Sequence, residues 1–99
     1  MQTINNINKN VADFFSSLAD ETRLKIIISI SKGSKTVSQI HKSFGRRITL
    51  SAVSHQLKLL ESMDIIKHER KGREKHYSLS GDFCWCILKD AIKHFKSKK

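Results

Sequence analysis

Apolar residues recur at helical spacing in four successive segments before residue 61, and this pattern constrains the fold more than any other feature of the chain. The first segment carries one apolar stripe: Val11, Phe14, Phe15 and Leu18. The second carries another: Leu24, Ile27 and Ile28. Asp20 is a plausible N-cap for this second segment, and Gly33 supplies its stop. The spacing predicts two amphipathic helices with almost no loop between them.

The third and fourth segments predict two shorter helices on either side of a glycine. Thr36 and Gln39 form a capping-box pair, and Gly45 ends a helix whose apolar face is Val37, Ile40 and Phe44. Thr49 is placed to cap the fourth helix. Its predicted buried face is Leu50, Val53, Leu57 and Leu60.

The pattern changes after Ile65. Ile66–Arg70 and Lys75–Leu79 predict a two-stranded hairpin around a charged tip of Lys71, Gly72 and Arg73. Residues 82–95 then return to helical spacing. The predicted fold class is mainly α, a winged helix-turn-helix with four helices, a two-stranded wing and a fifth helix.

A chain of 99 residues has room for one domain, residues 1–99, and we expect residues 1–9 and 96–99 to be frayed tails. The chain has neither an apolar run long enough to span a bilayer nor the layout of a signal peptide, so we expect a cytoplasmic protein without a membrane partner. Two cysteines, Cys84 and Cys86, are too few for a zinc ribbon and too close for an ordinary intrachain disulfide.

The charge predicts an anionic partner. Lys and Arg number 19 against 9 Asp and Glu, a formal net charge of +10. Opposite the leucines of the fourth helix lie short polar or cationic side chains: Ser51, Ser54, His55 and Lys58, with Gln56 at the edge. A surface helix normally mixes both signs, yet residues 45–60 contain no Asp or Glu. This face is suited to base edges and phosphates in a major groove.

Further cations stand where a winged helix would meet the DNA backbone. The hairpin tip holds Arg70, Lys71, Arg73 and Lys75, which only Glu69 and Glu74 offset. The predicted phosphate contacts are Arg46, Arg47, Lys58, Lys71, Arg73 and Lys75.

Three stretches carry a family resemblance: L-A-D-E-T-R-L at 18–24, S-A-V-S-H-Q-L-K-L-L at 51–60 and R-K-G-R-E-K-H-Y-S-L at 70–79. Over residues 11–95 the chain resembles the ArsR/SmtB family of winged-helix repressors. The resemblance implies a homodimer that binds an inverted-repeat operator in double-stranded DNA, with base contacts by Ser51, Ser54, His55 and Gln56 and wing contacts by Arg73 and Lys75. The turn at 45–49 is about two residues longer than is usual in that family, and the additions are Arg46 and Arg47.

The resemblance also implies that the first and last helices form the dimer interface. The residues on their apolar stripes are Val11, Phe14, Phe15, Ile87, Leu88, Ala91, Ile92 and Phe95.

Members of that family commonly sense metals, but the family's ligand patterns do not fit this chain. A Cys-x-Cys pair would fall near residues 37–39, where there is no cysteine. The second pattern maps to Gly81, Phe83, His94 and Ser97, and His94 alone is a ligand type. A variant set, Cys86, Asp90 and His94, shares one helical stripe and could hold zinc or a softer ion. The plainer interpretation is two exposed helix residues and a small buried cysteine, so we expect no cofactor.

Thiol chemistry at Cys84 and Cys86 is the rival sensing route, by oxidation or an intersubunit disulfide. On a helix the two would point about 200° apart, which argues against a shared ion or bond. Adjacent Ser54 and His55 project about 100° apart and no oxyanion loop follows, so we expect neither an enzyme nor a small-molecule substrate. Two alternatives stay open: an architectural DNA-binding protein without sequence preference, and a module that binds an acidic protein.

Overall fold

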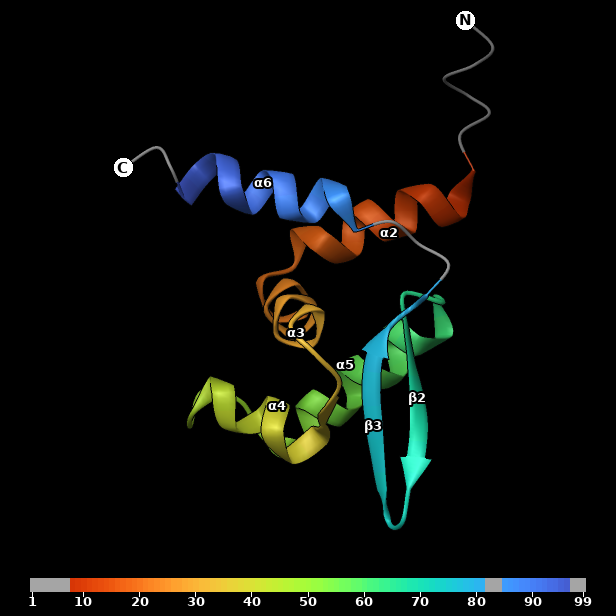
Figure 1. Ribbon diagram of the computed structural model, residues 1–99, viewed down its shortest axis with the longest axis vertical. Helices are drawn as coiled ribbons and strands as arrows, with labels where there is room; N and C mark the ends of the chain where they lie inside the picture. The colour runs from red at the N-terminus through yellow and green to blue at the C-terminus, as the bar shows by residue number, and fades with distance from the viewer. Residues whose placement is uncertain (1–7, 82–84, 97–99) are drawn as a thin grey trace, which may run out of the picture.

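The computed structural model describes residues 8–81 and 85–96, and Figure 1 shows their arrangement. Its helices are α2 (Lys9–Ala19), α3 (Glu21–Ser31), α4 (Val37–Phe44), α5 (Leu50–Ser62) and α6 (Cys86–Lys96). Its strands are β1 (Lys35–Thr36), β2 (Ile66–Lys71) and β3 (Glu74–Leu79). The predicted order of five helices with a hairpin before the last is confirmed, and the hairpin points away from α2 and α6 (Figure 1).

Side-chain caps begin the helices where the sequence places them. Asp20 accepts from the backbone N–H of Arg23 at 2.9 Å, and Thr49 accepts from that of Ala52 at 3.1 Å. Thr36 and Gln39 form the predicted capping box.

Lys9 and Lys96, which we expected in the tails, are the first residue of α2 and the last residue of α6. Lys9 begins α2 because the Asn8 side chain accepts the backbone N–H of Asn10 at 2.7 Å. Residues 1–7 and 97–99 lie outside the described part of the chain.

The sheet has three strands in the order β1-β3-β2 rather than the two predicted. β1 pairs antiparallel with β3, Lys35 opposite Tyr77 and Thr36 opposite His76. Two residues are too short to show a period-2 pattern, so the sequence could not reveal β1. Between β2 and β3 the turn consists of Gly72 and Arg73, and the φ of +66° at Gly72 is one that glycine adopts without strain.

The core lies where α3, α4 and α5 meet the sheet. Its fully buried side chains are Ile26, Ile27, Ile40, Val53, Leu57 and Leu60. The prediction that Leu50 belongs to this buried face is wrong, because its side chain is 48% exposed. Leu50 is the first residue of α5, directly after the Thr49 cap, and lies beyond the reach of the core that holds Val53 and Leu57.

The last helix begins later than predicted. The apolar spacing placed its start at Asp82, whereas α6 begins at Cys86, and residues 82–84 lie outside the described part of the chain. Among the described residues, no helix is long and apolar enough to cross a membrane.

Candidate DNA-binding surface

A fixed turn joins α4 to α5. Gly45 ends α4 with a φ of +66°, and its N–H donates to the carbonyl of Lys42 at 3.2 Å. His41 Nε2 donates to the carbonyl of Ile48 at 2.9 Å, which ties the far side of the turn back to α4. Arg46 and Arg47 are both exposed. The turn thus presents two guanidinium groups beside the start of α5.

The outer face of α5 is exposed where the sequence places it. Ser51, Ser54, His55 and Lys58 are exposed, while Val53 and Leu57 on the opposite face are fully buried. Gln56 differs, because it is half-buried and its Oε1 atom is buried without a hydrogen-bond partner among the described residues. The DNA-contacting roles of these five residues stay predictions.

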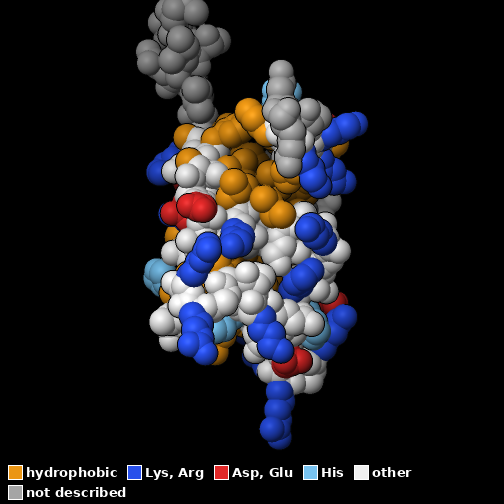
Figure 2. Space-filling view, turned by 90° about the vertical axis from the view of Figure 1, so that its left-hand side faces the viewer, with side chains coloured by type: hydrophobic (Ala, Val, Ile, Leu, Met, Phe, Trp, Pro, Cys, Tyr) orange, Lys and Arg blue, Asp and Glu red, His pale blue; other side chains and the backbone are white. Residues whose placement is uncertain are grey.

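The wing adds a second set of cations. Arg70, Lys71, Arg73 and Lys75 are all exposed at the end of the hairpin that is far from the core. Figure 2 shows one face of the molecule, with apolar side chains gathered at its upper end and Lys and Arg side chains spread over the lower half, toward the wing tip. Figure 1 shows that α4, α5 and the wing, the elements that carry or border the predicted phosphate contacts, lie on the side of the molecule away from α6.

A contact between α5 and β2 fixes the base of the wing. Glu61 Oε2 contacts His68 Nδ1, and the His68 ring lies 5.5 Å from the Tyr77 ring, centroid to centroid. Burial raises the pKa of Tyr77 above its usual value, and the Glu61 carboxylate raises it further. The sequence did not reveal this cluster, because it depends on how the hairpin returns past the end of α5.

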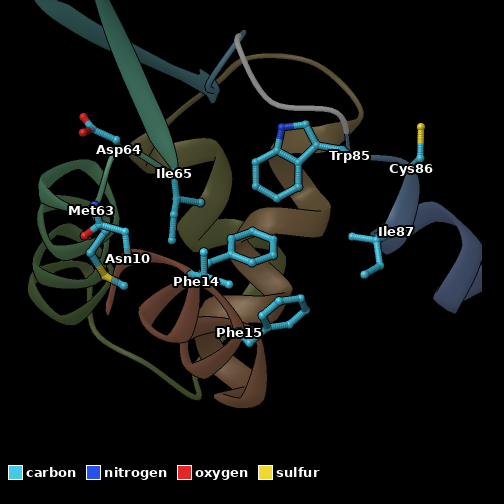
Figure 3. A pocket seen from close by; sticks show the side chains of 10 residues that line it. Asn10, Phe14, Phe15, Met63, Asp64, Ile65, Trp85, Cys86 and Ile87 are labelled. Carbon is cyan, nitrogen blue, oxygen red and sulfur yellow. The ribbon is translucent and has the colours of Figure 1, made fainter. Parts of the chain in front are cut away.

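The opposite end of the molecule exposes apolar side chains. On α2 and α6 the exposed ones are Val11, Phe15, Ile87, Ile92 and Phe95, which we call the α2–α6 surface. A pocket of about 570 Å³ opens beside it, and Figure 3 shows Phe14 and Phe15 of α2 on one side and Trp85 and Ile87 on the other.

The remaining three predicted interface residues lie differently on these helices. Ala91 is exposed, Phe14 is half-buried, and Leu88 is 6% exposed and packs in the protomer's own core.

The sensor candidates do not form a site in the described part of the chain. Among residues 8–81 and 85–96, no three His, Cys, Asp or Glu side chains gather as metal ligands, so Cys86, Asp90 and His94 are not brought together. Of the positions taken over from the family's ligand pattern, only His94 has a side chain that binds metals. That pattern therefore supplies one metal-binding side chain in this chain, and the absence of a resident metal stays a prediction.

Cys86 is disulfide-bonded, which contradicts the expectation of no intrachain disulfide. That expectation came from the close spacing of the two cysteines, and the further argument that they point apart assumed a helix through both, whereas α6 begins only at Cys86. Cys84 lies outside the described residues.

Known proteins resemble both the sequence and this architecture. The family model for the bacterial regulatory proteins of the arsR family matches residues 20–68. A transcriptional repressor SmtB homolog from Synechocystis is 31% identical over 88 residues, covering 89% of this chain and 65% of its own length. The HTH-type transcriptional regulator NmtR from Mycobacterium tuberculosis is 33% identical over 84 residues, covering 85% of this chain and 68% of its own length.

A solved structure extends the similarity to the fold. It is the homodimeric winged helix-turn-helix DNA-binding domain of a possible ArsR-family regulator from Mycobacterium bovis, with a TM-score of 0.75 at 24% identity, covering 90% of this chain and 84% of that one. Since the family model, the relatives and the winged helix-turn-helix fold agree, the chain belongs to the arsR family of bacterial regulatory proteins.

Proposed function

We propose that this protein is a homodimeric transcriptional repressor that binds an inverted-repeat operator in double-stranded DNA. The observation that supports this most is the exposed outer face of α5, which follows a basic turn and lies in a stretch, residues 45–60, that contains no Asp or Glu. The wing adds further exposed cations. A face of one sign attracts a polyanion, and a helix of short polar side chains fits a major groove. The Synechocystis relative, itself a repressor, supports the same direction of regulation.

Each element has its own part in this function. Ser51, Ser54 and His55 lie on the exposed face of α5, where they would contact base edges, and Gln56 lies at its half-buried edge. Arg46, Arg47, Lys58, Lys71, Arg73 and Lys75 would neutralise phosphates and so hold α5 in register on the duplex.

The α2–α6 surface supports the homodimer. Its side chains include Phe15, 50% exposed, and Phe95, 74% exposed, and a second copy of this surface would remove both from water. Two-fold symmetry then places the two α5 helices about one helical turn of DNA apart, near 34 Å.

The test is selection of binding sequences from random duplex DNA, followed by competition between the selected site and random duplex at several salt concentrations. We expect a clear preference for an inverted repeat, and affinity that falls with a log-log slope of about −0.9 per phosphate contacted. An architectural protein would show no preference between the two duplexes. A module for acidic proteins would bind neither duplex at about 100 mM salt.

We infer no catalytic role and no resident metal for this repressor, which acts on DNA in the cytoplasm. The family is one of transcriptional regulators rather than enzymes. The competition is repeated with added zinc, with a chelator and with a thiol reductant. We expect zinc and chelator to leave operator affinity unchanged, whereas a change with reductant would point to Cys86 and thiol sensing.

A further inference from the structure

A second pocket lies between the start of α4 and the wing. It has a volume of about 280 Å³ and is lined by Thr36, Val37, Ser38, Arg70, Arg73, Glu74 and Lys75. We call it the α4–wing pocket. β1 brings its two sides together, because Thr36, which caps α4, is paired with His76 of β3.

The two faces of the hairpin carry different charge pairs. Residues directly opposite one another in an antiparallel ladder point to the same face. The face that packs on the protein contains the pair Ile66 and Leu79 and the pair His68 and Tyr77, and it continues outward into Arg70 opposite Lys75. On the other face the outermost pair is Lys71 opposite Glu74, a cation with an anion.

Like charges directly opposite one another are unfavourable, whereas opposite charges are favourable. On the inner face the outermost pair is instead two cations, Arg70 and Lys75, and both line the pocket beside the start of α4. Within the described residues, none of the ion pairs involves Arg70, Arg73 or Lys75. Three cations against the single carboxylate of Glu74 leave an excess of positive charge that an anion in the pocket would offset.

The α4 side of the pocket supplies hydrogen-bond donors. The Thr36 hydroxyl oxygen accepts the N–H of Gln39 at 3.2 Å, so its own O–H remains able to donate. Ser38 is exposed and adds a second hydroxyl. Hydroxyls and guanidinium groups among the lining of one small cavity are hydrogen-bond donors of the kind from which phosphate oxygens accept.

We propose that the α4–wing pocket binds a phosphate group, and that in the repressor complex this group is one backbone phosphate of each operator half-site. The assignment rests on the proposed function and adds Thr36, Ser38 and Arg70 to it. One phosphate held from both sides would fix the wing relative to α4, so the wing lies on the backbone at a defined distance from α5.

The test combines a protein variant with chemically altered DNA. Arg70→Gln removes one charge from the pocket, and Lys67→Gln removes one from an exposed position of the same strand outside it. We expect Arg70→Gln to weaken operator binding roughly tenfold and to reduce the salt slope by about 1, and Lys67→Gln to have a much smaller effect. Glu74→Gln removes the pocket's carboxylate and is expected to strengthen binding.

A methylphosphonate scan of the operator identifies the phosphate itself. At one position in each half-site, the neutral linkage should weaken binding of the wild-type protein but cause no further loss with Arg70→Gln. No operator phosphate occupies the pocket if every neutral linkage weakens binding of Arg70→Gln as much as it weakens binding of the wild-type protein. The same holds if Arg70→Gln and Lys67→Gln lose the same amount of operator affinity. Those outcomes leave operator preference intact, whereas loss of the proposed function itself would appear as no preference by the wild-type protein.

A titration with inorganic phosphate separates the two sources of the group. In the absence of DNA, we expect millimolar phosphate to shift the backbone amide resonances of Val37 and Ser38 in the wild-type protein but not in Arg70→Gln. The pocket would be assigned to a free phosphate compound if these resonances shift saturably but no methylphosphonate position in the operator depends on Arg70. That result would overturn the operator part of the proposal. Absence of both effects would overturn the whole assignment.

Discussion

The two ends of this molecule expose opposite chemistry. The end built from α4, α5 and the wing presents hydroxyls, imidazole and cations, while the α2–α6 surface presents phenylalanine and isoleucine. The buried core draws on both ends, since Phe44 of α4, Leu57 of α5 and Leu88 of α6 all belong to it. The exposed side chains at each end, such as His55 and Phe15, lie outside that core and are therefore free to match a partner: under the proposed function, a polyanion at one end and a second copy at the other.

The largest expected effect comes from placing a charge at the apolar end. Phe15→Glu should leave the protomer folded, because Phe15 is half exposed, but it should bury a carboxylate between two copies and prevent dimerisation. Loss of the second half-site should weaken operator binding on the order of 100-fold. Light scattering measures the mass, and fluorescence anisotropy measures the affinity.

Leu59→Glu is the matched control, since Leu59 is also an exposed apolar residue but lies on α5, outside the α2–α6 surface. It should remain a dimer. If Phe15→Glu also stays dimeric, the apolar end is not the interface and the contrast between the two ends loses its functional meaning.

A smaller effect is expected from the polar end. His55→Ala removes an exposed imidazole from α5 and should reduce the difference in binding free energy between operator and random duplex by roughly 1 to 3 kcal/mol. Gln56→Ala is predicted to act in the same way. Because Gln56 is half-buried and His55 is exposed, the two variants together show whether a more exposed side chain contributes more to sequence preference. Equal weakening on all duplexes would remove α5 from its assigned role.

The smallest effect is expected at Tyr77, which lies between the two ends. Its pKa is raised above 10.0 in the folded protein by burial and by Glu61, whereas in the unfolded chain the phenol ionises near its usual value. Stability should therefore fall as pH rises from about 10 toward the folded-state pKa, because the unfolded state loses this proton first. Urea unfolding at stepped alkaline pH should show a shallower fall for Tyr77→Phe than for the wild-type protein.

Tyr77 is the chain's one tyrosine, so an absorbance titration of the phenolate reads its pKa directly. If the titration midpoint equals the ordinary pKa of a tyrosine, the Tyr77 phenol is open to water, which would contradict its buried position beside Glu61.

Local patterns predicted most of the fold, and features that depend on pairing escaped them. The caps at Asp20, Thr36 and Thr49 could be predicted from the sequence, because each cap side chain accepts a hydrogen bond from the backbone N–H only three residues further along the chain. Leu50 was misplaced because helical periodicity gives the face of a residue but not how far the core extends along the helix. β1 and the start of α6 were missed for a related reason, since a two-residue strand has no period and the apolar stripe continued upstream of Cys86.

The candidate site shows the same division. The cations of the wing and the acid-free stretch at 45–60 could be counted in the sequence. The sequence could not show that Arg70 and Lys75 share one face of the hairpin, because a shift of one residue in the strand register would turn them to opposite faces. The turn of Gly72 and Arg73 sets that register, and its length is known only from the structure.

The two-residue strand β1 has a mechanical consequence. It attaches the entry of α4 to β3, and the chain that leaves β3 continues toward α6. We therefore expect the wing and α4 to move as one unit, so that the spacing between the wing and the start of α4 is the same on every operator. If the half-sites of an operator were moved apart by one base pair, the two protomers would have to shift relative to one another, because this spacing within each protomer would not change.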